Sequence, residues 1–251
     1  MTDHGELLSG GLIAEVVRIG DTVRRTPPAN AGFVAALLRH LEPTGLAPRY
    51  LGVDERGRQV LSHLDGRVPW REREDPAYFA DAALTRLGEV IRALHDACAG
   101  TELAGGAETV CHRDLSPKNT VYRHSDGGLL PVAFLDWDLA GPGRRIEDVA
   151  FAGWHWAELG GEADRAELGR RCRLLCDAYD AAALGPPLPR AELVDVMLAQ
   201  IEGTWRGIDA GADRGEPGLR RLRAEGTVEA VRSWQKWLLR HRTAVAEGLH
   251  A

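Results

Sequence analysis

Residues 110–139 read VCHRDLSPKNTVYRHSDGGLLPVAFLDWDL and contain two short polar patterns on either side of one turn. The first pattern is a His-x-Asp triplet with an Asn five residues after the Asp, namely His112, Asp114 and Asn119. The second ends an apolar run with two carboxylates that flank an indole, namely Asp136, Trp137 and Asp138. Residues 120–123 and 129–135 are predicted strands, because apolar runs there are separated by turn residues. We therefore expect a hairpin that brings both patterns together.

This grouping of carboxylates and an amide suits a nucleoside triphosphate with magnesium. Mg²⁺ prefers oxygen ligands, usually one or two carboxylates together with substrate phosphates. Phosphoryl transfer asks the protein mainly for positioning and charge neutralisation. In this interpretation Asp114 orients the acceptor hydroxyl, while Asn119 and Asp136 hold the metal. The His-x-Asp pattern alone is better explained as a loop of cap and turn residues, but both patterns at this separation favour catalysis.

Residues 112–119, HRDLSPKN, followed by residues 135–138, LDWD, resemble the aminoglycoside phosphotransferase and choline kinase superfamily. Members show His-Gly-Asp-Leu-x-x-x-Asn and then Ile-Asp-Trp or Ile-Asp-Phe. Asp148 matches a later Asp of the same family pattern. Arg113 departs from the usual Gly and moves the loop toward protein kinases, but protein kinases have Asp-Phe-Gly where this chain has Asp-Trp-Asp. The small-molecule branch therefore fits better.

The resemblance implies an α+β, bilobal, protein-kinase-like fold. A small antiparallel-sheet lobe would bind nucleotide over residues 1–66, and a mainly helical lobe over residues 67–251 would hold the catalytic residues and the substrate. It also implies Mg²⁺, with ATP or GTP as co-substrate, and adds Asp138 to the metal ligands. His112 and Asp148 would support the loop, Asp148 by accepting backbone N–H groups.

Composition and charge limit the function classes. With 251 residues, of which 44% are hydrophobic, the chain can bury a full core in one large or two small domains. The net charge of −6 argues against nucleic acid and is compatible with a cationic small substrate. Four cysteines without framework spacing predict free thiols. Because we find neither a signal peptide nor an apolar run of membrane-spanning length, we expect a cytoplasmic protein without membrane contact. Monomer and homodimer both stay open.

Residues 7–26 are predicted to form strands separated by glycine turns. Gly10 and Gly11 lie in one of these turns. Their backbone N–H groups could lie over the phosphates of a nucleotide. On sequence grounds alone, an ordinary tight turn is the better explanation of the pair.

A kinase needs a cation on its third strand, normally Lys, and no Lys precedes Lys118. Arg24 and Arg25 occupy this stretch, and strand alternation points only one of them inward. An Arg can bind phosphate with two donors, and we slightly prefer Arg24. Two solvated arginines on an edge hairpin are the alternative. The helix predicted over residues 31–41 lacks the Glu that normally holds the Lys, and Glu42 at its far end is a poor replacement.

Residues 48–53 and 58–64 are predicted as two more strands. The resemblance places a nucleotide-binding hinge at Ser62, His63 and Leu64, where backbone groups would bond the purine. A strand-end His that is merely half-exposed is the simpler alternative for His63.

The rest of the chain is predicted to be mainly helical. A helix with one apolar face follows Asp75. Residues 140–143 are expected to form an irregular loop, and residues 154–156 to open a helix whose two Trp side chains pack in the core. Further helices are predicted over residues 166–184, 190–210 and 218–247. In the family, substrates rest against these last helices. Five acids there could meet a cationic substrate: Asp177, Asp180, Asp195, Glu202 and Asp209.

Two classes of function follow from these patterns. The first is an enzyme that transfers the γ-phosphoryl of ATP or GTP to a small hydroxylated molecule, with an aminoglycoside-like antibiotic favoured. A metabolite kinase for choline, homoserine or a sugar stays open within this class. The second is a catalytically weak pseudokinase that binds a ligand, such as an immunity protein, because the strand Lys and the helix Glu are missing.

Overall fold

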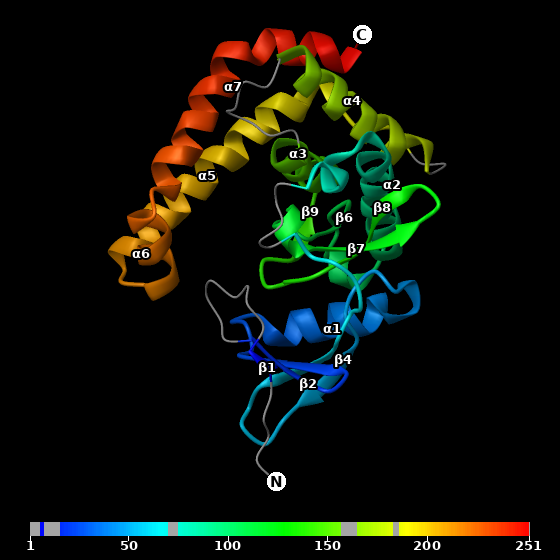
Figure 1. The fold of residues 1–251 in the computed structure, drawn as a ribbon, viewed down its shortest axis with the longest axis vertical. Helices are drawn as coiled ribbons and strands as arrows, with labels where there is room; N and C mark the ends of the chain where they lie inside the picture. The colour runs from blue at the N-terminus through cyan, green and yellow to red at the C-terminus, as the bar shows by residue number, and fades with distance from the viewer. Residues whose placement is uncertain (1–5, 8–15, 70–74, 157–164, 183–185, 251) are drawn as a thin grey trace.

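The computed structural model describes residues 6–7, 16–69, 75–156, 165–182 and 186–250 of the chain. These residues form a small sheet with one helix against it, two shorter strand pairs and a set of helices (Figure 1).

The small sheet has five strands in the order β1-β2-β3-β5-β4, and every neighbouring pair is antiparallel. Its strands are β1 (Glu6–Leu7), β2 (Val16–Ile19), β3 (Thr22–Arg25), β4 (Tyr50–Val53) and β5 (Gln59–Ser62). Gly20, at φ +58°, makes the turn between β2 and β3, as the Gly-Asp pair predicted. Helix α1 (Ala31–Leu41) has the predicted bounds. We call β1–β5 with α1 the small-sheet region.

Two further strand pairs surround the polar patterns. The predicted hairpin is formed by β7 (Thr120–Ser125) and β8 (Gly128–Phe134). The second pair is β6 (Thr109–Cys111) with β9 (Gly141–Gly143). The prediction of an irregular loop at 140–143 is therefore wrong for its last three residues. A Gly-Pro-Gly run carries no strand signal, but a Cβ at Gly143 would lie 2.8 Å from Cys111 Sγ, so glycine permits this close pairing.

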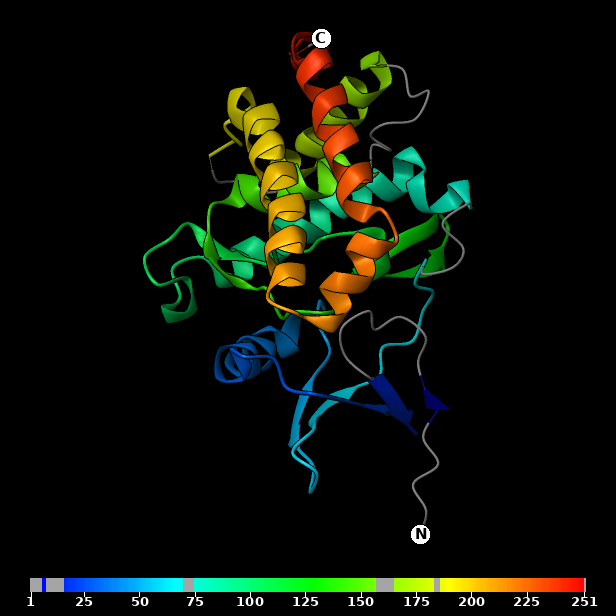
Figure 2. The same ribbon diagram turned by 90° about the vertical axis from the view of Figure 1, so that its left-hand side faces the viewer.

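Six helices complete the described part of the chain: α2 (Asp81–Cys98), α3 (Arg145–Trp156), α4 (Arg165–Ala181), α5 (Leu193–Asp213), α6 (Pro217–Ala224) and α7 (Thr227–His250). α2 packs on α4, and α7 packs on both α4 and α5. Figure 2 shows α5 and α7 side by side, with α6 joining them at the end that points toward the small-sheet region. No helix among the described residues is both long and apolar enough to cross a membrane.

Two helix predictions need correction. Trp154 and Trp156 lie in the last turn of α3 rather than opening a helix. α3 starts earlier because two glutamates cap it: Glu147 Oε1 accepts the N–H of Arg144 three residues before it, and Glu108 Oε2, distant in sequence, accepts that of Arg145. Both indoles are buried, at 4% and 0% exposure, as predicted. The helix predicted over 218–247 is broken into α6 and α7 at Gly226, whose φ is +81°.

The small-sheet region is joined to the β7–β8 hairpin by backbone hydrogen bonds. The N–H of Phe134 donates to the carbonyl of Leu46 at 2.9 Å. Arg67 and Tyr122 exchange two such bonds, both of 2.8 Å, directly after the chain leaves β5. The division into lobes at residues 66 and 67 stays a prediction; the bond from Phe134 to Leu46 crosses this boundary, and the pair of Arg67 with Tyr122 ties the chain to the hairpin directly after it.

Candidate active site

The hairpin of β7 and β8 brings the two polar patterns side by side. Thr120 and Phe134 are partners in this antiparallel pair, so Asn119 and Leu135, just outside it, face each other. The N–H of Leu135 donates to the carbonyl of Asn119 at 2.7 Å. The loop before β7 and the loop after β8 therefore lie next to each other.

Asn119 fixes the position of Asp114. Asn119 Nδ2 donates to Asp114 Oδ2 at 2.7 Å and to the Asp114 carbonyl at 3.0 Å. Lys118 Nζ lies 3.6 Å from the same Oδ2. Burial raises the pKa of Asp114 above its ordinary value, and the charge of Lys118 only partly opposes this rise. Asp114 is therefore a better proton acceptor than an exposed Asp.

His112 connects the two loops. Its Nε2 lies 2.8 Å from the carbonyl of Leu135, which can only accept, so Nε2 carries the hydrogen. Nδ1 is then the acceptor for the N–H of Asp114 at 3.3 Å. The buried ring also packs against Trp137, with ring centroids 4.5 Å apart. His112 therefore holds the loop of Asp114 and the loop of Asp136 in place from the buried side of the site.

Asp148, fully buried in α3, holds the first loop by its backbone. It accepts the N–H of His112 at 2.7 Å and that of Arg113 at 2.8 Å, as well as His95 Nε2 at 3.1 Å. Burial by itself would raise the pKa of Asp148. Hydrogen bonding and the charge of His95 outweigh burial, so the pKa lies below its ordinary value. His95 Nδ1 lies 2.8 Å from Tyr179 Oη, which extends the network to α4.

Three buried side chains of this network, one His, one Cys and one Asp, bring possible metal-ligating atoms close together. The ligand atoms of His95, Cys111 and Asp148 lie within 4.8 Å of one another. Both His95 ring nitrogens already have partners, and Cys111 Sγ donates to the carbonyl of Arg144 at 3.2 Å. Because these groups already satisfy one another, we interpret the trio as structural.

Two residues of the loops have left-handed backbone conformations that L-residues rarely adopt. Arg113 has φ +65° and Asp136 has φ +60°. Arg113 stands where the superfamily usually has Gly, and its φ explains why Gly is preferred there. Arg113 Nη2 donates to the carbonyl of Pro142 at 2.5 Å, which compensates part of the strain. Such strain is concentrated at functional sites.

Arg25, at the end of β3, reaches across to the second polar pattern. Its Nη1 donates to Asp136 Oδ1 at 3.1 Å, and its Nη2 donates to Asp138 Oδ2. The guanidinium is largely buried, with 12% of the side chain exposed. The small-sheet region thus contributes a cation directly to the acidic loop.

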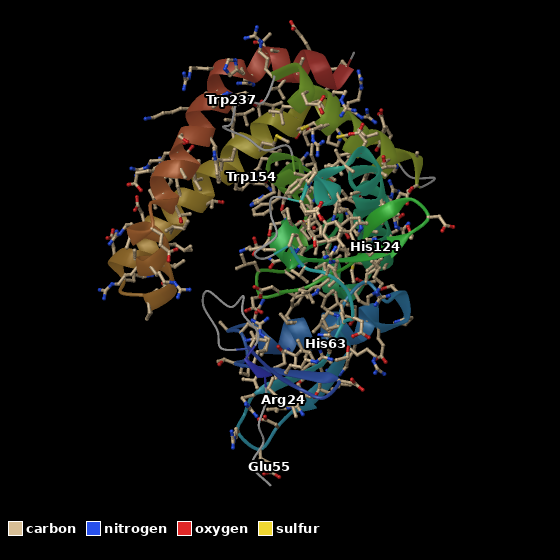
Figure 3. The ribbon with its side chains drawn as sticks, viewed as in Figure 1. Arg24, Glu55, His63, His124, Trp154 and Trp237 are labelled. Carbon is tan, nitrogen blue, oxygen red and sulfur yellow. The ribbon has the colours of Figure 1, made fainter. Side chains whose placement is uncertain are left out.

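The slight preference for Arg24 over Arg25 is wrong about side-chain direction. Arg24 Nη1 donates to Thr22 Oγ1 at 2.6 Å, and its Nε lies 3.8 Å from Asp54. Successive strand residues face opposite sides. Arg24 therefore stays within the small-sheet region, where Figure 3 places it.

The oxygen atoms of the loops suit a hard divalent cation. Asp136 is about half exposed, and Asp138 Oδ1 is buried without a hydrogen-bond partner. Since Asn119 Nδ2 is directed at Asp114, its Oδ1 is the atom that can bind a cation. A buried carboxylate oxygen without a partner is unfavourable, and a bound cation would remove that penalty. Asn119, Asp136 and Asp138 therefore fit a magnesium site.

The expected nucleotide hinge is only partly available. The N–H of Ser62 donates to Arg49 O at 2.9 Å, and that of His63 donates to Asp21 O at 2.8 Å. The His63 ring lies 3.3 Å from Asp65. Within the described part of the chain, the N–H of Leu64 has no hydrogen-bond partner, so Leu64 suits a purine better than its two neighbours. Gly10 and Gly11 lie outside the described residues.

The five acidic candidates of α4 and α5 are all paired with arginine. Arg190 bonds two of them, and each of the other three has an arginine partner at 2.6–3.0 Å. The pairs are Asp177–Arg190, Asp180–Arg190, Asp195–Arg242, Glu202–Arg206 and Asp209–Arg232. These acids are therefore not uncompensated charges that await a cationic substrate.

Sequence reasoning missed two site features. Lys118 was noted only as the first lysine, although the loop brings its Nζ to 3.6 Å from Asp114, four residues earlier. The pairing of Arg25 with Asp138 had no sequence signal, because 113 residues separate the two.

Comparison with known proteins gives one family match. The model of the "Phosphotransferase enzyme family" matches residues 4–103 and 97–184. The trifolitoxin immunity protein of Rhizobium leguminosarum bv. trifolii is 35% identical over 198 residues, which are 68% of this chain and 72% of that protein.

Solved structures show the same fold at low sequence identity. A choline/ethanolamine kinase family protein from Mesorhizobium loti has a TM-score of 0.63 and 19% identity over 98% of this chain and 93% of its own. An aminoglycoside phosphotransferase from Streptomyces rimosus, in complex with ADP and streptomycin, has a TM-score of 0.55 and 16% identity over 80% and 91%. The predicted superfamily and the α+β kinase-like fold are confirmed.

Proposed function

Because the chain belongs to the phosphotransferase enzyme family, we propose that it transfers the γ-phosphoryl group of ATP or GTP to a hydroxyl of a small molecule. The observation that carries this proposal is the pairing of two adjacent loops: Asp114 and Asn119 bond each other in the first, and Asp136 and Asp138 bond Arg25 in the second. Pure ligand binding does not require these groups together, whereas phosphoryl transfer uses each of them.

Each side chain has a distinct part in the proposed transfer. Asp114 accepts the proton of the acceptor hydroxyl. At the same time the hydroxyl oxygen forms a bond to the γ-phosphorus, and the bond between the γ-phosphorus and the β–γ bridging oxygen breaks. The raised pKa of Asp114 favours this proton transfer. Asn119, Asp136 and Asp138 would hold Mg²⁺, which neutralises phosphate charge. Lys118 and Arg25 add positive charge on either side.

The acceptor is proposed from the relatives and from the charges of the last helices. Neighbouring structures include aminoglycoside phosphotransferases with bound streptomycin, gentamicin or kanamycin, so an antibiotic hydroxyl is the first acceptor to test. Residues 193–250, however, contain nine Lys and Arg against eight Asp and Glu. Because the five acids described above pair with arginine, we expect little selection for polycations. Choline, ethanolamine, homoserine and uncharged sugars therefore belong in the same panel.

The test is phosphoryl transfer by the wild type and by Asp114→Asn. Transfer from radiolabelled ATP and GTP to each acceptor is measured with Mg²⁺. We expect Asp114→Asn to lower turnover about 100- to 10,000-fold, as for loss of a general base, while the affinity for a non-hydrolysable ATP analogue stays within about threefold. Asp126→Asn is the matched control, because Asp126 is exposed at the tip of the same hairpin. Equal turnover in Asp114→Asn and the wild type would refute the proposal.

A second function, immunity by sequestering a toxic ligand, is favoured by one observation. The relative at 35% identity is named an immunity protein. A sequestering protein would protect cells equally well with Asp114→Asn, since chemistry would not be needed. A phosphotransferase would lose protection in that variant, although the variant folds and binds nucleotide. Toxin survival of cells that express either form separates the two functions.

A further inference from the structure

Among the described residues, Arg25 forms ion pairs only with two carboxylates of the proposed metal site. Its Nη1 contacts Asp136 at 3.1 Å and its Nη2 contacts Asp138. In protein kinases the strand cation is held by a Glu of the neighbouring helix. Here α1 reads AGFVAALLRHL and contains no acid. Asp138 therefore pairs with the strand cation here, as the helix Glu does in protein kinases.

Both members of this pair have a polar atom left over. Arg25 Nε and Asp138 Oδ1 are buried, and neither has a hydrogen-bond partner. A buried donor and a buried acceptor without partners are unfavourable in the free protein. Arg25 Nε can satisfy an additional oxygen acceptor, and Asp138 Oδ1 can satisfy a cation. The pair can thus bind an anionic ligand through Arg25 and a cationic ligand through Asp138.

The charges explain why the two ligands should enter together. Arg25 supplies one positive charge to two carboxylates, so the divalent cation must compete with a guanidinium already in place. A triphosphate attracts the same guanidinium through charge-assisted, bidentate hydrogen bonds. When Arg25 turns toward phosphate, Asp136 is released to the metal while Asp138 keeps the guanidinium oriented.

Resting on the proposed function, we propose that Arg25 is the phosphate-binding cation and that Asp138 is the residue that positions it. In the nucleotide-free protein the same contacts keep the metal position closed. Divalent cation and nucleotide therefore bind as a pair, and neither binds strongly alone.

Binding of Mn²⁺ and of nucleotide analogues tests this inference without turnover. Free Mn²⁺ is followed by electron paramagnetic resonance, first without nucleotide. We expect Arg25→Gln to bind Mn²⁺ at least about tenfold more tightly than the wild type, because removing a nearby cation is worth at least ~1.4 kcal/mol. With Mg²⁺ present, the same variant should bind AMPPNP or GMPPNP at least tenfold more weakly. Arg24→Gln is the matched control, since Arg24 contacts Asp54, and should change neither affinity.

A double-mutant comparison tests the positioning role of Asp138. Asp138→Asn should weaken Mg²⁺-dependent AMPPNP binding more in the wild type than in the Arg25→Gln background, because the loss of a metal ligand is common to both and only the wild type also loses the positioning of Arg25. An equal loss in both backgrounds would make Asp138 a metal ligand alone and overturn this role. Unchanged Mn²⁺ affinity in Arg25→Gln would overturn the inference that Arg25 keeps the metal position closed in the nucleotide-free protein.

The proposed function can fail separately. A wild type that binds neither analogue with Mg²⁺ contradicts phosphoryl transfer and the phosphate-binding part of the inference, while the nucleotide-free Mn²⁺ titration still decides whether Arg25 closes the metal position. A wild type that binds an analogue, together with an Arg25→Gln variant that binds it equally well, overturns the inference and leaves the proposed function intact.

Discussion

At the scale of single residues, Lys118 should control the protonation of the proposed base. Lys118 Nζ lies 3.6 Å from Asp114 Oδ2, and its charge lowers a pKa that burial raises. Lys118→Met removes this opposition, so the pKa of Asp114 should rise further. The acidic limb of the pH–rate profile, which requires ionised Asp114, should move to higher pH. The profile is measured by nucleotide-dependent phosphate release, with Lys236→Met, exposed on α7, as the control. If the acidic limb of the pH–rate profile stays at the same pH in Lys118→Met, that limb reports a group other than Asp114.

Two carboxylates, Asp114 of the first loop and Asp148 of α3, affect stability with opposite signs. The pKa of Asp148 is lowered on folding, so Asp148 contributes stability above pH 3.8 that is lost as the pH falls through its folded pKa. The pKa of Asp114 is raised, so its ionisation opposes folding at neutral pH. The site is therefore electrostatically unfavourable at Asp114 and is held in place by Asp148.

Sequence patterns identified the loop residues better than the cation that faces them. Asp114, Asn119 and Asp136 are close because one short hairpin connects them, and hairpins can be read from local sequence. The choice between Arg24 and Arg25 depends on which sheet face meets the rest of the molecule. Since adjacent strand residues point to opposite sides, an error of one residue reverses the answer.

At the scale of elements, Gly88 sets how closely α2 approaches α4. A Cβ at Gly88 would lie 2.7 Å from the carbonyl oxygen of Leu175 and 2.9 Å from Ala178 Cβ. Gly88→Ala should therefore lower the free energy of unfolding by about 1–2 kcal/mol, because overpacking outweighs the gain in helix propensity. Chemical denaturation followed by circular dichroism measures this change.

Gly203 provides the matched comparison for this substitution. It also lies inside a long helix, α5, but a Cβ there would have nothing within 4 Å. Gly203→Ala should raise the free energy of unfolding by about 1 kcal/mol through helix propensity alone. Equal effects of the two substitutions would mean that α2 and α4 are not held at this distance.

Element types were predictable where the chain carries periodic or turn signals, and not where partners are distant. The bounds of α1 follow from its apolar spacing and from the prolines before it. β9 was missed because its pairing with β6, about 30 residues earlier, supplies what its composition lacks. The start of α3 was missed because Glu108, far away in sequence, caps it.

At the scale of the whole molecule, the proposed site is shared between two parts of the chain. Arg25 belongs to the small-sheet region, while Asp136 and Asp138 follow the hairpin of β7 and β8. A family resemblance predicted that these parts form one kinase-like fold. It did not predict that the cation would reach the second acid of the Asp-Trp-Asp triplet, because that depends on how the parts are set against each other.

Gly66 fixes that setting where the chain, after leaving β5, runs alongside the hairpin of β7 and β8. Its φ is +148°, and a Cβ there would lie 2.4 Å from Val121 Cγ1 and 2.7 Å from Tyr122 O. Gly66→Ala should disturb the paired hydrogen bonds of Arg67 with Tyr122 and shift Arg25 relative to Asp136. We expect stability to fall by about 1–3 kcal/mol from backbone strain. We also expect about tenfold or greater weakening of Mg²⁺-dependent AMPPNP binding from misplacement.

Thermal melts and calorimetric titration of AMPPNP measure both effects of Gly66→Ala. Gly57→Ala separates strain from misplacement, because Gly57 also has a positive φ, +75°, but lies in the turn between β4 and β5, where a Cβ would have nothing within 4 Å. It should lose stability and keep its nucleotide affinity. If Gly66→Ala also keeps that affinity, the contacts of Arg67 with Tyr122 do not set the distance between Arg25 and Asp136, and the alignment must come from the other contacts between the two parts, such as the bond from Phe134 to Leu46 or the ion pairs of Arg25.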